Sequence, residues 1–310
     1  MNRKVWAAVL FVVMIGLVYL LGAQQVGMAL LPEETSAISM DPSLISFAES
    51  NQMLVANCES GQAGEVHVEA VLQDSLLAQA EQKQLGYTPR QRIAYADRTN
   101  YGERFTKDVR GRQVGNDPIV VLHETVGSAS GVIGLFQTRH PRDDDQVSYH
   151  TLIALNGTII YMVPPNKRAF GAGNSVFQGP EGLESVQTNP KFPGSVNNFA
   201  YHISLETPPD GIHNGRGHRG YTEAQYQSLG WLVAKTGVPD QRITTHKAVD
   251  RSGSRRDPRS FSQKKFLKIL NTYPRADEIG LACSMPSPLV EPDTHASKPG
   301  YNTPGNTIGR

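Results

Sequence analysis

The sequence predicts an α/β fold in which a mixed β-sheet is flanked by helices. Strand-like and helical stretches alternate along the chain, and an Asn156-Gly157 pair joins two β-rich runs into a hairpin. The 310 residues are 39% hydrophobic, which is enough to bury a core and excludes a chain that is disordered throughout. One domain, at about residues 87–275, accounts for the pattern.

Basic and acidic residues nearly balance. Thirty Lys and Arg residues stand against 29 Asp and Glu residues, so the formal net charge is +1. A nucleic-acid binder relies on a strong positive field, and this composition provides none. We therefore expect no nucleic-acid partner, and we expect a monomer.

The first 31 residues are typical of a segment that enters a membrane. Arg3 and Lys4 precede a stretch without charge at residues 5–31, whose most apolar part spans residues 5–21. Its length favours an uncleaved anchor, although Gly27-Met28-Ala29 is also typical of a signal-peptide cleavage site, and both alternatives stay open. In either case the positive-inside rule predicts that the rest of the chain lies outside the cytoplasm.

Residues 32–86 predict a polar arm with one helix, in which apolar residues recur at three- and four-residue spacing near residues 68–80. The two cysteines, Cys58 and Cys283, bracket the predicted domain. In an oxidising compartment they are candidates for a disulfide, and two unrelated free thiols are the alternative.

The first element of the domain is a buried strand. Residues 87–118 are rich in charge and poor in periodicity, and we interpret them as a connecting segment. The apolar run at residues 118–123 is typical of a strand buried on both faces, and it ends at His123. A histidine where a buried strand emerges is well placed to bind a metal, although for that residue taken alone a structural histidine is the more common case.

A short helix is expected at residues 130–138, followed by the hairpin at residues 148–164. Strand alternation places Tyr149 on one face of the first hairpin strand and His150, with Leu152, on the other. We therefore interpret His150 as a core or edge residue rather than a ligand.

A long stretch rich in Gly, Asn, Pro and Ser at residues 167–198 predicts a functional loop. Strand character returns at residues 199–207, where His202, Ser204 and Glu206 share one face. Glu206 at the strand end is a candidate base, and a solvated strand terminus is the alternative.

The last third of the domain predicts helix, strand and helix. Thr222 and Gln225 form a capping box at the start of a helix that ends before Gly237. A strand at residues 241–246 delivers His246, and a final helix precedes Pro274. The buried faces of the two helices are expected at Tyr226, Leu229, Leu232 and Val233, and at Phe266, Ile269, Leu270 and Tyr273. His213 and His218 in the loop before them are expected to be exposed, and residues 276–310 predict a disordered Pro/Ser/Gly-rich tail.

His246 and Asp257 lie eleven residues apart, which is too far for one helix face. The polar loop between them must fold back if both are to reach a single ion. Mononuclear catalytic zinc sites usually take three protein ligands, so a third nitrogen or oxygen donor is expected elsewhere in the chain.

Taken together, seven segments resemble the zinc-dependent N-acetylmuramoyl-L-alanine amidases of the type 2 family, which is related to bacteriophage T7 lysozyme and the peptidoglycan recognition proteins. In chain order these segments read IVVLHE, SYHTLIALNGTIIYMVPP, AFGAGNS, HISLET, YTEAQYQSLGWLVA, ITTHKAV and RRDP. The resemblance covers about residues 119–270. It implies a mixed sheet flanked by helices and a Zn²⁺ cofactor.

The resemblance also implies roles for single residues. It makes His123, His246 and Asp257 the zinc ligands and Glu206 the catalytic carboxylate. Tyr149 becomes an active-site tyrosine beside the metal. Arg255 falls where the family usually has lysine or threonine contacting the developing oxyanion. That departure keeps the charge of lysine but replaces a compact ammonium group with a planar guanidinium group.

The sequence departs from the family pattern at two further places. Phe170-Gly171 replaces the frequent Trp-His pair, and His202 replaces a small residue of the strand that ends at Glu206. His202 shares its face with Glu206, so a contact with substrate or metal is a hypothesis for it.

The implied reaction is hydrolysis of the amide bond between muramic acid and L-alanine in peptidoglycan or soluble muropeptides. An extracytoplasmic location after a membrane segment fits a cell-wall substrate. A non-catalytic peptidoglycan-binding module is the main alternative, and a structural envelope protein is a third; all three implied ligand positions are filled, which favours the enzyme.

Overall fold

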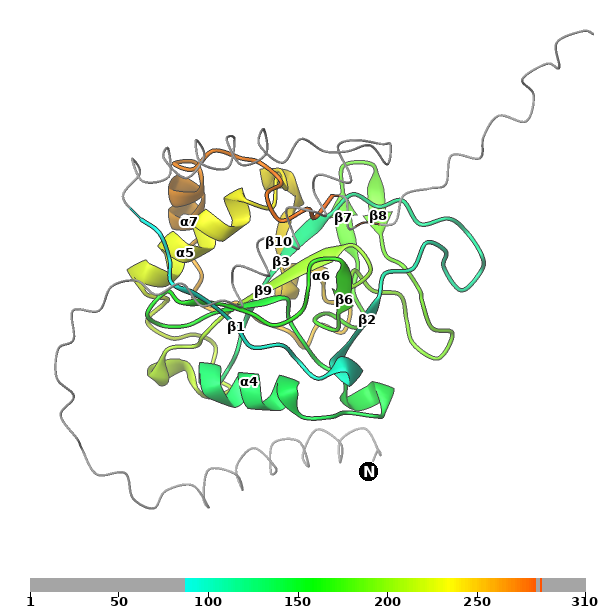
Figure 1. Ribbon diagram of the computed structural model, residues 1–310, viewed down its shortest axis with the longest axis horizontal. Coiled ribbons are helices and arrows are strands. Elements are labelled where there is room, and N and C mark those ends of the chain that lie inside the picture. Colours follow the sequence, from blue (N-terminus) through cyan, green and yellow to red (C-terminus); the bar gives the residue numbers. More distant parts are fainter. Residues whose placement is uncertain (1–86, 283–284, 286–310) are drawn as a thin grey trace, which may run out of the picture. The chain divides into compact units, whose positions relative to one another are not determined.

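The computed structural model describes residues 87–282 and Met285, all within one compact unit. A six-stranded sheet runs through the domain (Figure 1). Neighbouring strands are parallel except for one antiparallel pair, β4 and β5, so the predicted mixed sheet is confirmed. In sheet order the strands are β1 (Gln91–Ile93), β5 (Ile159–Tyr161), β4 (Thr151–Ile153), β9 (Ala200–Leu205), β3 (Ile119–Glu124) and β10 (Ile243–Thr245).

The two longest strands, β3 and β9, lie side by side near the middle of the sheet. Every residue of both is buried, as expected for strands covered on both faces. Their parallel register pairs His123 with Ser204 and Val121 with His202. Because paired residues of parallel strands point to the same face, His123 and His202 lie on one side of the sheet.

The hairpin between β4 and β5 confirms the signal at Asn156-Gly157. Gly157 has φ +82°, a backbone conformation that residues with a side chain rarely adopt. A Cβ atom there would also lie 2.7 Å from the hydroxyl of Tyr87 and 2.9 Å from the carbonyl oxygen of Ala224. The turn therefore requires glycine for both its conformation and its close contacts.

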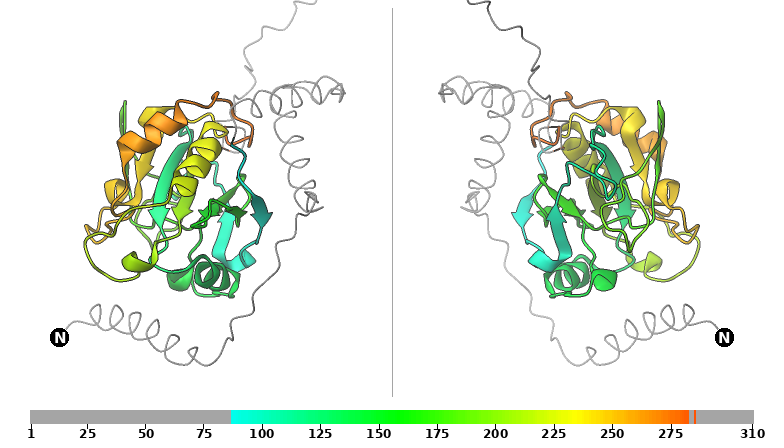
Figure 2. Two further views of the ribbon diagram at one scale, coloured as in Figure 1. Left: turned by 90° about the vertical axis from the view of Figure 1, so that its left-hand side faces the viewer. Right: turned by 90° about the vertical axis from the view of Figure 1, so that its right-hand side faces the viewer.

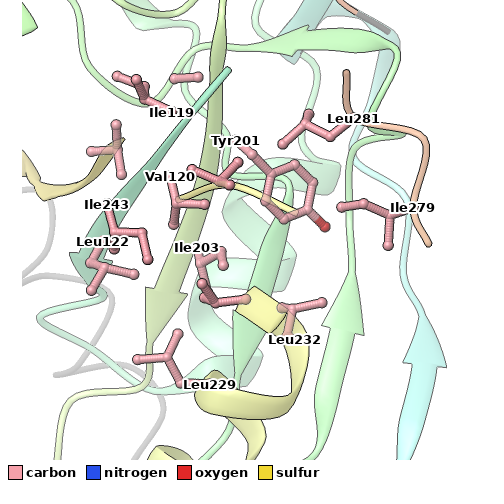
Figure 3. Close-up of a cluster of buried hydrophobic side chains, with 14 of the residues drawn as sticks. Ile119, Val120, Leu122, Tyr201, Ile203, Leu229, Leu232, Ile243, Ile279 and Leu281 are labelled. Carbon is pink, nitrogen blue, oxygen red and sulfur yellow. The ribbon is translucent and has the colours of Figure 1, made fainter. Parts of the chain in front are cut away.

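Helices cover both faces of the sheet (Figures 1 and 2). Helix α4 (Ala129–Gln137) packs on one face, while α5 (Glu223–Ala234) and α7 (Gln263–Leu270) pack together on the other. The predicted capping box of α5 is present, with both hydrogen bonds between Thr222 and Gln225. All eight residues expected on the buried faces of α5 and α7 are buried. Leu229 and Leu232 of α5 reach the sheet (Figure 3).

Short elements complete the domain. They are the helix α6 (His246–Val249), the strands β2 (Tyr101–Glu103), β6 (Lys167–Ala169), β7 (Phe177–Gly179) and β8 (Gly182–Glu184), and the 3-10 helices η1 (Arg98–Asn100), η2 (Asp143–Asp145), η3 (Pro209–Gly211) and η4 (Asp240–Arg242). β2 pairs with β6, and β7 with β8, in two small antiparallel sheets.

Three expectations need correction. Residues 87–118 are more than a connection, because they contain β1 and β2, and the glycine-rich segment 167–198 contains β6, β7 and β8. The folded part also continues into the predicted tail, where Ile279, Leu281 and Met285 are buried against the core. Propensity does not reveal three-residue strands, because their pairing decides whether they form: β1 and β2 pair with partners distant in the sequence, and β7 and β8 pair with each other.

The predicted membrane segment, the helix of the N-terminal arm, and Cys58 and Cys283 lie outside the described residues. Within residues 87–282 no helix is long and apolar enough to cross a membrane.

Candidate metal centre

Two adjacent strands bring the first two predicted ligands together. His123 is the penultimate residue of β3, and His246 directly follows β10 as the first residue of α6. The strands are parallel neighbours in which Thr245 pairs with Leu122, so both histidines emerge at the same edge of the sheet. The side chain of Thr245 caps α6 by accepting a hydrogen bond from Ala248 N, which fixes the turn at His246.

The loop after α6 returns Asp257 to the same place. The carboxylate of Asp250 accepts hydrogen bonds from Ser252 N at 3.0 Å and Arg255 N at 2.9 Å, which curls the loop. Lys247 N then donates to the carbonyl oxygen of Asp257 at 2.9 Å. The loop therefore folds back, as predicted, and brings Asp257 next to His246 although eleven positions separate them in the sequence.

The donor atoms of the three residues form a tight triangle. His123 Nδ1 lies 3.1 Å from His246 Nδ1 and 3.3 Å from Asp257 Oδ2, and His246 Nδ1 lies 3.0 Å from the same oxygen. A tetrahedral zinc ion with bonds of about 2.0–2.1 Å to nitrogen holds its ligand atoms about 3.3 Å apart. Two imidazoles and one carboxylate are also a donor set that zinc prefers, so these residues fit zinc.

Burial sets the protonation of this cluster. It is the largest of the causes that together lower the pKa of His123 to about 4; the hydrogen bond and charge of Asp257 oppose burial, and the neighbouring His246 and Arg255 act with it. For Asp257, burial alone would raise the pKa of the carboxyl, but the contacts with His123 and His246 outweigh burial and hold that pKa well below its usual range. His123 is therefore neutral and Asp257 ionised at pH 7, as ligands must be.

Tyr149 lies directly beside the donor triangle. Its ring stacks on the ring of His123, with centroids 4.4 Å apart and planes inclined by 28°. Burial, with the charge of Asp257, raises the pKa of the Tyr149 hydroxyl well above its usual value, so the phenol stays protonated and can donate a hydrogen bond. Strand alternation predicted Tyr149 and Leu152 on opposite faces of the sheet, but both side chains pack in the same hydrophobic cluster. The alternation does not apply to Tyr149, because β4 begins only at Thr151.

Arg255 is exposed on the loop that carries Asp257. Its positive charge acts on both His123 and Tyr149, and in each case it lowers the pKa. The guanidinium is thus near enough to influence charge at the cluster, while its exposure leaves it able to meet a ligand.

The carboxylate of Glu206 is held by two backbone amides. Oε1 accepts a hydrogen bond from Ala129 N at 2.7 Å, and Oε2 accepts one from Leu155 N at 2.8 Å. These bonds tie the end of β9 to the first turn of α4 and to the hairpin. Glu206 is half-buried and shares the His123 face of the sheet, but its hydrogen bonds go to these amides and not to the donor triangle. Its catalytic role stays a prediction.

Two further histidines lie behind the cluster. The Nδ1 atom of His202 is 2.9 Å from Nε2 of His123, so His202 contacts one of the predicted ligands; a contact with substrate or metal stays a hypothesis. His150 is fully buried and hydrogen-bonded to the backbone of His202 and Lys167, in agreement with its interpretation as a core residue. Burial lowers the pKa of both His150 and His202 well below the usual value, so both are neutral.

A buried polar network on the other side of β3 is not apparent from the sequence. The carboxylate of Glu124 accepts hydrogen bonds from Arg259 Nε and from the hydroxyl of Tyr221 at 2.9 Å, and it lies 3.1 Å from His218 Nε2. The His218 side chain is completely buried, so its expected exposure is wrong, whereas His213 is exposed as expected. Arg259 also donates to the carbonyl oxygen of His213 at 2.7 Å. The network anchors both the loop before α5 and the segment after Asp257.

Residues 115–260 match the family model described as N-acetylmuramoyl-L-alanine amidase. No curated protein matches the chain. Among solved structures, a selenomethionine derivative of AmpD is 24% identical over 60% of this chain and 97% of that one, with a TM-score of 0.42. AmpDh3 from Pseudomonas aeruginosa, in complex with anhydromuramic pentapeptide, is 18% identical over 56% of this chain and 63% of its own, with a TM-score of 0.36.

The Drosophila peptidoglycan recognition protein SD is 14% identical over 51% of this chain and 84% of that one, with a TM-score of 0.31. The family match at residues 115–260 spans every strand and loop that contributes to the donor triangle. This domain belongs to the type 2 amidase family, that of the N-acetylmuramoyl-L-alanine amidases.

Proposed function

We propose that the protein is a zinc-dependent N-acetylmuramoyl-L-alanine amidase of the cell envelope. Its substrate is the amide bond between the lactyl group of muramic acid and L-alanine, in peptidoglycan or in soluble muropeptides. The observation that carries the proposal is the convergence of His123, His246 and Asp257 within a domain of this family. His123 and His246 lie where β3 and β10 end, and the loop after α6 brings Asp257 to them.

Two neutral imidazoles and one carboxylate leave a site charge of about +1 when zinc is bound. Zinc there would polarise the amide carbonyl and lower the pKa of a bound water to about 7. Asp257 contributes the single negative charge, and His123 stays neutral because it is buried. The residues around the triangle then have to move protons and stabilise charge.

Glu206 is the proposed proton acceptor. Each of its carboxylate oxygens uses one lone pair for a backbone N–H and keeps a second lone pair for a proton. The two amides hold the carboxylate in place while Glu206 takes a proton from water and passes it to the leaving amine. Tyr149 and Arg255 are the donors available to the oxyanion of the substrate, the first beside His123 and the second from the exposed loop.

A non-catalytic binding module of the same fold is the alternative. It would bind peptidoglycan without cleaving it, and it would have no need for a complete donor triangle. The agreement of the three donor separations with those expected around a zinc ion favours the enzyme.

The test is zinc content together with product analysis. The purified full-length protein is expected to contain one zinc per chain and to release the stem peptide from muropeptides, with mass spectrometry locating the cut. His123→Ala and His246→Ala should each lose zinc and activity, whereas the control His140→Ala, at a histidine outside the cluster, should keep both. Stoichiometric zinc in both ligand variants would refute the metal site. Zinc with substrate binding but no cleavage in the wild type would identify a binding module.

The extracytoplasmic location is part of the proposal. It is supported by the charge-free stretch at residues 5–31 behind Arg3 and Lys4. Peptidoglycan lies outside the cytoplasmic membrane, so a chain that is exported or anchored there meets its substrate directly. Protease accessibility of the domain in intact cells tests this location.

A further inference from the structure

We propose that His202 is a positioning residue that fixes which nitrogen of His123 binds the metal. The inference rests on the proposed function, because it concerns how a zinc ligand is oriented. His202 stands where the family pattern has a small residue, so neither the position nor the residue type is assigned a role by the resemblance.

The imidazole of His123 is engaged at both nitrogens. Nδ1 faces the donor triangle, 3.1 Å from His246 Nδ1 and 3.3 Å from Asp257 Oδ2. Nε2 faces the opposite way and lies 2.9 Å from Nδ1 of His202. The ring of His123 therefore bridges the metal site and the buried histidine behind it.

Metal binding decides the direction of the bond between the two histidines. A neutral imidazole carries one proton, and Nδ1 of His123 can give its lone pair to a metal only if that proton is on Nε2. The Nε2–H of His123 then donates to Nδ1 of His202. Ligand histidines commonly donate their second N–H to an outer partner that fixes the tautomer, and here a neutral histidine occupies the place usually taken by a carboxylate or carbonyl.

The ring of His202 is itself held in this orientation. A Cβ atom at Gly171 would lie 2.7 Å from both Cγ and Nδ1 of His202, so the ring rests directly against the glycine backbone. The ring of His150 lies nearly parallel to it, inclined by 9° with centroids 5.8 Å apart. The two departures from the family pattern, at residues 171 and 202, are thus in direct contact: the histidine ring at residue 202 occupies space that a side chain at residue 171 would need.

His150 completes the arrangement from the backbone. Its Nε2 lies 3.0 Å from the carbonyl oxygen of Lys167, which can only accept, so Nε2 carries the proton of His150. Its Nδ1 then accepts from His202 N at 2.9 Å, while His150 N donates to the carbonyl oxygen of His202 at 3.0 Å. This pair of bonds fixes the backbone from which the His202 ring projects.

Packing alone does not explain a histidine at residue 202. The residue is fully buried, and its Nε2 has no hydrogen-bond partner among the described residues. A buried polar atom without a partner costs stability that an apolar side chain would avoid. Within the part of the chain that the structure describes, the only side-chain hydrogen bond of His202 is the one to His123, which points to a role at that residue.

Three substitutions separate the hydrogen bond from the volume of the side chain. His202→Asn attaches an acceptor to Cγ, where Nδ1 stands in histidine, whereas His202→Gln moves the acceptor one carbon further along the side chain. His202→Leu fills the space without any acceptor. Zinc affinity of the full-length protein is measured by competition with a chelator, and melting of each chelated variant confirms that it is folded.

We expect His202→Asn to bind zinc within about threefold of the wild type, and His202→Gln and His202→Leu to bind it about 10- to 100-fold more weakly. The control His140→Leu replaces a half-buried histidine that contacts Asn100 and should leave zinc affinity unchanged. Gly171→Ala keeps every polar atom but displaces the His202 ring, so it should weaken zinc binding as well.

A spectroscopic readout reports the tautomer directly. Long-range nitrogen–proton correlation spectra of the zinc-loaded protein should show the proton of His123 on Nε2. A proton on Nδ1, or equal zinc affinity in the Asn, Gln and Leu variants, would overturn the inference while leaving the zinc site intact. A wild-type protein that binds no zinc would instead overturn the proposed function, and this inference with it.

Discussion

At the scale of single residues, Glu206 combines two tasks that one substitution can separate. Glu206→Gln keeps a carbonyl oxygen for one backbone amide but turns an NH₂ group toward the other, which leaves a donor unpaired at a cost of about 1–3 kcal/mol. The change also removes the proton acceptor, and positioned acid–base groups contribute about 10²- to 10⁴-fold. We expect near-normal zinc content, a lower melting temperature and loss of most turnover.

Zinc content, melting temperature and amidase turnover are measured on the same preparation of Glu206→Gln. If the variant melts early but turns over within a few-fold of the wild type, Glu206 is a structural clamp and the base is another residue. Loss of zinc would make Glu206 a ligand and place Asp257 in doubt.

The residues of the site differ in how far the sequence could predict them. His123 and His246 were predictable because each ends a strand-like run, and a short loop connects His246 to Asp257. His202 could be placed on the correct face by alternation, but its contact with His123 depends on the register between β3 and β9. Pairing register is a property of two segments 79 residues apart and leaves no local signal.

The network around Glu124 was missed for a related reason. Glu124 reads as the polar residue that ends a strand, and Arg259 as one of several arginines in a loop. Both are buried, and Arg259 donates hydrogen bonds to the loop before α5. A charged residue in a sequence is usually exposed, so burial of a pair becomes visible only in three dimensions.

At the scale of elements, those with local chemistry were predictable and those without it were not. The turn at Gly157 and the capping box of α5 each depend on one or two particular residues, and both are present where the sequence predicts them. The strands β7 and β8 were not predicted, since each has three residues within a glycine-rich stretch. They matter for the site because β8 carries Glu184.

Glu184 joins the small hairpin to the starts of β3, the strand that carries His123, and of β10, the strand that precedes His246. Its two oxygens accept hydrogen bonds from Arg242 at 2.7 and 2.9 Å, and Arg242 also donates to the carbonyl oxygens of Asp117 and Pro118 ahead of β3. Glu184→Gln removes the charge and one acceptor from this partly buried pair. We expect a loss of about 1–2 kcal/mol in the free energy of unfolding at pH 7, with partial exposure limiting the effect.

The sign of the pH dependence follows from the pKa of Glu184. The hydrogen bonds from Arg242 lower that pKa in the folded protein against the opposing effect of burial. The stabilisation is therefore present above the unfolded value of about 4.3 and is lost as pH falls through the folded pKa. Chemical denaturation should show the wild type and Glu184→Gln converging below about pH 4. Glu181→Gln, at an exposed position of the same hairpin, is the control; a gap that stays constant with pH would contradict the ion pair.

At the scale of the whole molecule, the core extends further than the composition of the chain suggests. Ile279 and Leu281 pack against the core of the sheet beside Tyr201, although the sequence after Arg275 reads as a tail (Figure 3). Two carbonyl oxygens of the end of α5 accept bonds from this segment, from Ala276 N and Glu278 N. Amphipathic periodicity cannot detect a short irregular segment of this kind, because its apolar residues follow no regular spacing.

This packing bears on the two cysteines. Cys283 lies outside the described residues, but Leu281 and Met285 on either side of it are buried. We predict a disulfide between Cys283 and Cys58, which would tie the N-terminal arm to the domain. In the chain-entropy model a closed loop of this length stabilises by up to about 5 kcal/mol.

Thiol labelling of the exported, denatured and unreduced protein should therefore find no free thiol, reduction should reveal two, and the melting temperature should fall on reduction. Cys283→Ser is the matched control, in which Cys58 alone should react without reduction. Two reactive thiols in the unreduced wild type would instead show two independent cysteines and leave the arm without a covalent link to the domain.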